Sequence, residues 1–218
     1  MNFTISEENH LKSIYHLQQA SGTVNTNSLA AELNTKAASV TDMLKKLKAK
    51  KLLQYERYKG FKLNEAGKKA ALSIVRKHRL WEFFLVEKLG FEWDKVHAIA
   101  EELEHISSDE LVQRLENFLG NPSVDPHGDP IPDKNGKMPV IKQVNLFGVA
   151  LGHTVTVSSV SNQNSQMLEM LKHYNISIGT KLMVSKRFDF DGSLEIKVIK
   201  RSPCVLSEQI AKNIFVHE

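Results

Sequence analysis

The chain has 218 residues, more than one typical domain of about 100–150 residues requires, so two or three modules are expected. Its composition, 41% hydrophobic and 25% charged, is ordinary for a soluble globular protein. The single cysteine excludes an internal disulfide, and no run of residues has the character of a membrane span or a signal peptide, so a cytoplasmic protein without a membrane partner is expected.

The net charge of +4 conceals two oppositely charged regions. Residues 36–62 contain nine Lys and Arg against two acidic residues, a local net charge of +7. Residues 82–116 contain ten acidic residues against three basic ones, a local net charge of −7. This division predicts a polyanionic partner for the first region and cations for the second.

Three helices are predicted in the first fifty residues. The first covers residues 4–19, with Thr4 or Ser6 as its N-cap. A second, short helix at about 26–33 is followed by a tight turn and by a longer basic helix at about 37–50. A short helix, a brief turn and a longer basic helix form the helix-turn-helix pattern.

A β-hairpin is predicted directly after these helices. Residues 52–57 and 61–63 alternate in the manner of strands, and Tyr58-Lys59-Gly60 supplies the turn between them. The lysine run of residues 45–51 alone would fit a solvated surface helix. Together with the turn, the hairpin wing and the local charge, it favours a winged helix-turn-helix that binds DNA.

The DNA-binding residues follow from this arrangement. Base edges are reached from the N-terminal end of the recognition helix, whereas phosphates are contacted more widely. Asp42 would repel phosphate, so it either accepts a hydrogen bond from a cytosine amino group or turns away from DNA. The candidates for base edges are Lys36, Ala37, Ala38, Ser39, Thr41 and Asp42. The candidates for phosphates are Thr35, Ser39, Lys45, Lys46, Arg57 and Lys59.

Three amphipathic helices are predicted next, at about 64–89, 92–105 and 108–119. They carry more apolar surface than one small winged domain would cover. This surplus indicates a dimerisation module, and a twofold protein also suits symmetric half-sites on DNA.

Histidine and glutamate recur at helical spacing in two of these helices, which favours a metal site. Any one of these residues could belong to a solvated helix face, but all of them in register favour ligands, and imidazole with carboxylate suits Mn²⁺, Fe²⁺ or Zn²⁺. Six ligands exceed the need of one four-coordinate site, so a pair of ions is plausible. The residues are His78 and Glu82 in the first helix and His97, Glu101, Glu104 and His105 in the second.

The C-terminal part has a different composition. Residues 121–143, rich in proline and glycine at their start, predict a linker with an ordered start, in which His127 is a turn histidine rather than a ligand. Short β-rich runs and a helix at 165–173 predict a small SH3-like barrel. The expected fold is mainly α with small β parts. The expected domains are a winged helix-turn-helix (1–63), a helical metal-binding and dimerisation domain (64–120), a linker (121–143) and an SH3-like domain (144–218).

Four short motifs resemble a known family. They are Arg76-Lys77-His78-Arg79-Leu80, Lys95-Val96-His97, Glu104-His105 followed by Ser108-Asp109-Glu110, and His127-Gly128-Asp129-Pro130-Ile131-Pro132. Over the whole chain, the pattern resembles the diphtheria-toxin-repressor family of metal-dependent transcriptional regulators, and most closely its manganese-responsive branch.

The resemblance implies a homodimer that binds double-stranded operator DNA when Mn²⁺ or Fe²⁺ is bound, with two ions per subunit and no organic cofactor, and that represses metal-uptake genes. The six His and Glu residues above would be the ligands. The iron-sensing branch has cysteine at the position of Glu101, so the carboxylate favours manganese. Asn9 stands at a further ligand position, where it offers only a carbonyl oxygen and where Glu8 or His10 could substitute. Lys12 stands where some manganese-responsive members have a carboxylate.

Three other functions compete with this interpretation. A dinuclear metal hydrolase would also use His and Glu, but the sequence has no HExxH, no GxSxG and no phosphate-binding glycine loop, so an enzyme is not expected. A metal-independent winged-helix regulator would bind DNA with no response to metal. Metal storage would leave the basic N-terminal region without a role.

Overall fold

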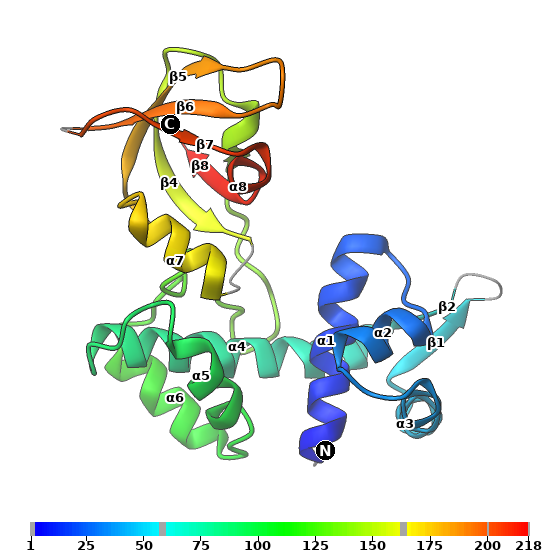
Figure 1. Cartoon of the computed structure of the whole chain (residues 1–218). Helices are drawn as coiled ribbons and strands as arrows, with labels where there is room; N and C mark the ends of the chain where they lie inside the picture. The colour runs from blue at the N-terminus through cyan, green and yellow to red at the C-terminus, as the bar shows by residue number, and fades with distance from the viewer. Residues whose placement is uncertain (1–2, 57–59, 162–164, 200, 218) are drawn as a thin grey trace. The chain divides into compact units, whose positions relative to one another are not determined.

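The computed structural model describes residues 3–56, 60–161, 165–199 and 201–217 (Figure 1). The chain divides into two compact units. Unit 1 comprises residues 1–81, 101–120 and 131–138, and unit 2 comprises residues 82–100, 121–130 and 139–218. Among the described residues, no helix is long and apolar enough to cross a membrane.

Unit 1 begins with three helices, α1 (Ile5–Ser21), α2 (Thr26–Glu32) and α3 (Ala37–Ala49), which are grouped together in Figure 1. Thr4, one of the two predicted N-caps, caps α1 and forms a capping box with Glu7. The predicted bounds of the three helices agree with the structure to within two residues.

The predicted wing is a two-stranded antiparallel sheet. Strand β1 (Leu53–Glu56) pairs with β2 (Gly60–Leu63). Residues 57–59, which include most of the predicted turn, lie outside the described part of the chain. Phe61 also exchanges backbone hydrogen bonds with Val24, 2.9 and 3.0 Å long, so the wing is joined to the segment that follows α1.

One apolar core fixes the three helices and the wing. It includes the side chains that the helical spacing predicts to point inward, among them the completely buried Leu11 and Ile14 of α1. Its largest fully buried members are Leu11, Ile14, Leu29, Leu47, Leu72 and Ile74. Burying such side chains stabilises a fold by about 1.5–3 kcal/mol each.

Three further helices follow, α4 (Glu65–Glu87), α5 (Val96–Leu103) and α6 (Asp109–Phe118). Helix α5 is shorter than predicted: Glu92 to Lys95 precede it in a turn, and Glu104 and His105 follow its last residue. The prediction that Glu104 and His105 continue a helical stripe is therefore wrong. Their side chains are held by tertiary ion pairs in unit 1, and these contacts override the local helical pattern.

Unit 2 contains a six-stranded antiparallel sheet with the strand order β3-β8-β4-β5-β6-β7. The strands are β3 (Val144–Asn145), β4 (Thr154–Val160), β5 (Lys181–Arg187), β6 (Leu194–Val198), β7 (Cys204–Leu206) and β8 (Ile214–His217). Helix α7 (Ser165–His173), the short α8 (Glu208–Lys212) and the 3-10 turn η1 (Leu146–Gly148) accompany it. The sequence predicted α7 and four of these strands but not β3, β7 or α8.

The start of the predicted linker is ordered, as expected. Asp125 accepts hydrogen bonds from the backbone of His127 at 2.8 Å and of Asp129 at 3.0 Å, which closes a compact turn. The carbonyl of His127 accepts a bond of 3.0 Å from the amide of Val160 in β4. His127 lies in a turn, as expected, but its complete burial was not expected. The predicted domain boundaries stay a prediction.

Gly128 allows this turn to approach β4. It has a φ of +84°, and a Cβ atom there would lie 1.8 Å from the carbonyl oxygen of Ser158. Gly152 has a similar φ of +81°, but nothing lies within 4 Å of its Cβ position. The two glycines therefore share a backbone requirement, and only Gly128 has a steric one.

We predict that Gly128→Ala lowers the free energy of unfolding by about 1–3 kcal/mol more than Gly152→Ala does, because only the first adds a steric clash to the backbone strain. Chemical denaturation of both variants and the wild type measures this difference. Equal destabilisation by the two substitutions would contradict the close approach.

Candidate functional site

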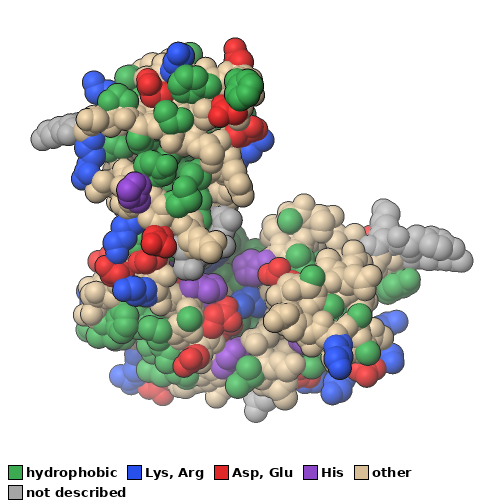
Figure 2. All heavy atoms as spheres, viewed as in Figure 1, with side chains coloured by type: hydrophobic (Ala, Val, Ile, Leu, Met, Phe, Trp, Pro, Cys, Tyr) green, Lys and Arg blue, Asp and Glu red, His purple; other side chains and the backbone are tan. Residues whose placement is uncertain are grey.

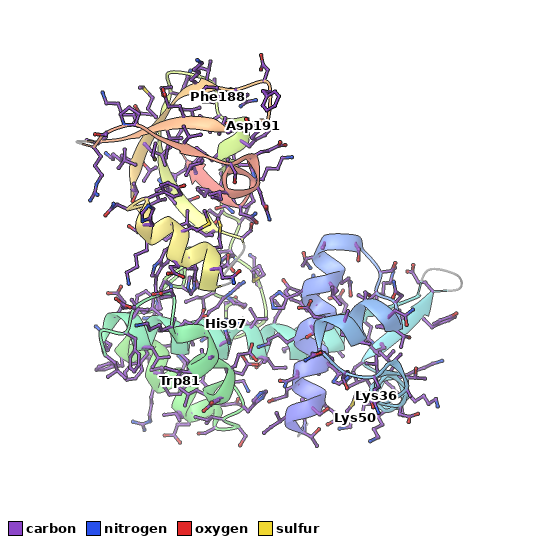
Figure 3. The ribbon with its side chains drawn as sticks, in the orientation of Figure 1. Lys36, Lys50, Trp81, His97, Phe188 and Asp191 are labelled. Carbon is purple, nitrogen blue, oxygen red and sulfur yellow. The ribbon has the colours of Figure 1, made fainter. Side chains whose placement is uncertain are left out.

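The N-terminal end of α3 is a free surface. Every described residue predicted to contact DNA is exposed: Thr35, Lys36, Ala37, Ala38, Ser39, Thr41, Asp42, Lys45 and Lys46. Lys36 is the N-cap of α3 and is labelled in Figure 3, together with Lys50 at the other end of the helix. The remaining two predicted contacts, Arg57 and Lys59, lie outside the described residues.

Asp42 forms an ion pair within α3, and its role toward DNA stays a prediction. Its carboxylate pairs with Lys45 at 3.0 Å, one turn further along α3, and both side chains are more than 70% exposed. In Figure 2, acidic and basic side chains accordingly lie together on the surface where Figure 1 shows α3. Lys46 has no acidic partner among the described ion pairs, which leaves it suited to a phosphate.

An ion pair joins α1 to the end of α3. Glu7 lies 2.6 Å from the ammonium of Lys50, the C-cap residue of α3. Burial acts to raise the pKa of Glu7, but Lys50 and the capping bonds to Thr4 outweigh it, so this pKa lies below its ordinary value of 4.5. The position of α3 thus depends in part on an ionised carboxylate of α1.

The first group of predicted metal ligands, in unit 1, centres on Glu104, whose side chain is completely buried. Its carboxylate accepts a hydrogen bond of 2.8 Å from Lys12 and lies 2.6 Å from Nδ1 of His78. Lys12 also forms a short ion pair with Glu101 in the last turn of α5. Burial acts to raise the pKa of Glu104, but His78 and Lys12 outweigh it and hold this pKa below its ordinary value.

Two further predicted residues in unit 1 lie on or beside α1. Nδ1 of His105 is 2.6 Å from a carboxylate oxygen of Glu8, so Glu8 is the α1 carboxylate that lies beside a predicted ligand. His10 instead directs Nδ1 to a carbonyl of its own helix, at 2.7 Å. Oδ1 of Asn9 is buried and has no hydrogen-bond partner among the described residues, as expected of an oxygen that awaits a cation or a donor.

A second group lies in unit 2. Glu82 and His97 are predicted ligands, whereas Asp125 and His127 are not. Glu82, Asp125 and His127 are all buried, and one ligand atom from each lies within 4.8 Å of the others. Nδ1 of His127 is 3.7 Å from Glu82 and 4.0 Å from Asp125. His97, which is half exposed and is labelled in Figure 3, places Nδ1 3.3 Å from Glu82.

The tautomer of His127 follows from its other nitrogen. Nε2 lies 2.9 Å from the carbonyl oxygen of Trp93, which can only accept, so Nε2 donates and Nδ1 faces the two carboxylates. Burial acts to lower the pKa of His127, but Glu82, Asp125 and the Trp93 carbonyl outweigh it and raise this pKa. The arrangement therefore favours a positive charge at Nδ1, supplied either by a proton or by a metal ion.

The residues of the second group fit a divalent cation. Two buried carboxylates and an imidazole nitrogen are a donor set for Mn²⁺, Fe²⁺ or Zn²⁺. A hydrogen bond from the far ring nitrogen to a backbone carbonyl is the usual support of a metal-binding histidine. The sequence does not identify Asp125 as a ligand, because the loop composition of residues 121–132 predicts a turn there. The alternating Asp125, His127 and Asp129 are the feature of the sequence that could have indicated a metal site.

The predicted ligands are divided between the two units. His78, Glu101, Glu104, His105 and Asn9 belong to unit 1, whereas Glu82 and His97 belong to unit 2. Within unit 1, His78, Glu101 and Glu104 are brought together around Lys12, and within unit 2 His97 meets Glu82. That all of them are ligands stays a prediction.

Three family models match the chain. One described as "Iron dependent repressor, N-terminal DNA binding domain" matches residues 2–61. A second, "Iron dependent repressor, metal binding and dimerisation domain", matches residues 64–133, and a third, "FeoA domain", matches residues 144–218. The HTH-type transcriptional regulator MntR of Oceanobacillus iheyensis is 34% identical over 116 residues, which are 53% of this chain and 78% of that protein.

The chain belongs to the diphtheria-toxin-repressor family of metal-dependent transcriptional regulators. The predicted resemblance and the predicted fold class are thereby confirmed.

Other similar proteins support this assignment. A solved structure called "Manganese-dependent transcriptional repressor complex with manganese" is 35% identical, with a TM-score of 0.86 over 96% of this chain and 98% of that one. "ScaR with bound Cd2+" is 31% identical, with a TM-score of 0.82 over 97% and 99%. The iron-dependent repressor IdeR of Mycobacterium tuberculosis is 34% identical over 125 residues, 57% of this chain. The chain spans about half the length, 54%, of this and the other IdeR relatives.

We predict that Glu7→Gln, which retains a capping side chain but loses the charge, lowers the free energy of unfolding at pH 7 by about 1 kcal/mol. Because the folded-state pKa of Glu7 is depressed, its contribution is complete above its ordinary value of 4.5 and is lost as pH falls through the folded-state pKa. Denaturation of both proteins across this range measures the difference.

Glu32→Gln is the matched control, because Glu32 is an exposed glutamate at the end of α2. It should change stability little at any pH. A deficit in Glu7→Gln that persists unchanged at low pH would rule out the ion pair as its cause.

Proposed function

We propose that this chain is a DNA-binding transcriptional repressor that senses Mn²⁺, with Fe²⁺ as the alternative, and acts on operator DNA as a homodimer. The genes under its control would be those of metal uptake. The observation that carries the proposal lies within unit 1: α1 contacts the end of the DNA-facing helix through Glu7 and two predicted metal ligands through Lys12. Helix α1 therefore links the predicted metal site to α3, the helix predicted to contact DNA.

The ligands proposed are the predicted set with two additions. Glu82 and His97 would act with Asp125 and His127 in unit 2, where the buried donor atoms lie close together. His78, Glu101, Glu104 and His105 would act in unit 1, with Glu8 beside His105 and with Asn9 offering an oxygen. When bound, the metal supplies positive charge to buried carboxylates, and two groups fit the two ions expected per subunit.

The coupling follows from what α1 touches. A change at Glu101 or Glu104 that releases Lys12 breaks the ion pairs between α1 and the residues at the end of α5. Through Glu7 and Lys50, the same helix restrains α3. A coupling of about 1–3 kcal/mol between effector and DNA would suffice for a graded response.

The surface of α6 supports a homodimer. Leu111 and Phe118, seven positions apart and so on one face of the helix, are 40% and 64% exposed, while Val112 and Leu115 are buried. Exposed large apolar side chains on one helical face suit association with a second copy. A regulator of this kind has no need of catalysis, so we propose no enzymatic activity.

We predict that Mn²⁺ strengthens binding of the wild type to the promoter region of its own gene, and that Glu101→Ala, His105→Ala and Asp125→Ala each reduce this enhancement about tenfold or more. Fluorescence anisotropy of labelled DNA, titrated with Mn²⁺, Fe²⁺ and Zn²⁺, measures it. Equal enhancement in all three variants would refute the ligand assignment. DNA affinity that is indifferent to every metal would instead favour the metal-independent regulator.

Lys46→Ala tests the predicted DNA-contacting surface of α3 separately. Removing one phosphate contact should weaken binding to all sequences and reduce the slope of log affinity against log salt concentration by about one unit. Lys197→Ala, which removes an exposed lysine of β6 in unit 2, is the control and should leave the slope unchanged. An unaltered slope in Lys46→Ala would remove α3 from the DNA interface.

A further inference from the structure

Lys12 has unusual surroundings for a lysine. The residue is only 9% exposed, and its ammonium group contacts carboxylates from two residues of another segment, Glu101 and Glu104. The distances to the two oxygens of Glu104 are 2.7 and 2.8 Å. Glu104 is itself completely buried, and His78 approaches one of its oxygens at 2.6 Å.

An ammonium group in this position does what a bound cation would do. It places one positive charge between two carboxylates, and its three N–H groups can satisfy several oxygens at once. Removing one partner from a buried ion pair leaves the other charge uncompensated, which is strongly unfavourable. A divalent ion that bound Glu101 and Glu104 would therefore have to displace Lys12 or share the carboxylates with it.

Lysine and histidine differ in how they give way to a metal ion. An imidazole such as that of His78 can bind a metal ion once it is neutral. An ammonium group has three donors and no acceptor, so Lys12 cannot become a ligand while it is charged and has to leave the carboxylates instead.

We propose that Lys12 is a tethered cation that holds Glu101 and Glu104 in the absence of metal and competes with Mn²⁺ for them. The inference rests on the proposed function, because it concerns the same ligands. It adds that α1 stays attached to Glu101 and Glu104 without metal, and that Lys12 sets the Mn²⁺ concentration at which the unit 1 group fills.

The test compares Mn²⁺ binding by the full-length wild type and Lys12→Met, a substitution of similar size without charge. Free Mn²⁺ is measured by electron paramagnetic resonance, with no DNA present. Lys12→Met should bind one Mn²⁺ ion per subunit about tenfold or more tightly than the wild type does, because the competing charge is gone. The affinity for the other ion should stay the same.

Two controls isolate the charge at this position. Lys12→Arg keeps a cation and should bind Mn²⁺ as the wild type does. Lys62→Met removes another lysine of unit 1 that pairs with a carboxylate, Glu56, which is not among the proposed ligands, and should leave both Mn²⁺ affinities unchanged. If Lys12→Met does not fold, Lys12→Gln, which retains a polar end, takes its place.

A measurement on the wild type does not depend on any variant folding. The side-chain ammonium signal of Lys12, assigned by its absence from Lys12→Arg, is followed by ¹H–¹⁵N NMR during titration with diamagnetic Cd²⁺. It should shift or disappear as the unit 1 group fills. A signal that is unchanged at saturating Cd²⁺, or equal Mn²⁺ affinities in the wild type and Lys12→Met, would overturn the proposal. Since these readouts need no DNA, they are distinct from failure of the repressor function.

Discussion

A carboxylate removed from water requires a positive charge beside it, and this requirement governs the regulatory part of the molecule. Glu82 and Glu104 are both completely buried, one in each unit. In unit 1 the charge comes from Lys12, with His78 alongside. In unit 2 two imidazoles, those of His97 and His127, lie beside Glu82. An imidazole beside a carboxylate can itself bind the metal, whereas the ammonium of Lys12 has to give way to it.

Helix α1 gives these charges a mechanical consequence. Its capping box and its buried apolar residues fix it within the N-terminal core. Glu7 ties it to the end of α3, Glu8 faces His105, and Lys12 holds Glu101 and Glu104. A helix with so many ionic ties at one end responds to any change in the charge of those partners. Metal-dependent DNA binding needs such an element, one whose position both sites bias.

The parts of the fold that the sequence predicted well are those that local chemistry determines. Thr4 is one of the two predicted N-caps of α1, and apolar spacing placed α1 to α4 and α7 to within about two residues at each end. By contrast, Glu104 continues a helical stripe in the sequence but leaves the helix, because its carboxylate is drawn to Lys12, 92 positions away. Periodicity within a segment carries no information about such a partner.

The same limit applies to the candidate site. His127 was expected in a turn and lies in one, but its burial against Glu82 and Trp93 depends on segments distant in the sequence. Lys12 was recognised only as a departure from the family pattern; its role as a counter-ion needed coordinates. Strand β7 and helix α8 were missed because three- to five-residue elements carry too few positions for a period to be seen.

The most direct measurement is an anomalous difference map from crystals grown with saturating Mn²⁺. The account predicts a peak within bonding distance of Nδ1 of His127 and the carboxylates of Glu82 and Asp125, and a second peak beside Glu101 and Glu104 with the ammonium of Lys12 displaced. The absence of a peak beside Glu82, or a Mn²⁺ ion on Glu101 and Glu104 with Lys12 still in contact with them, would contradict it.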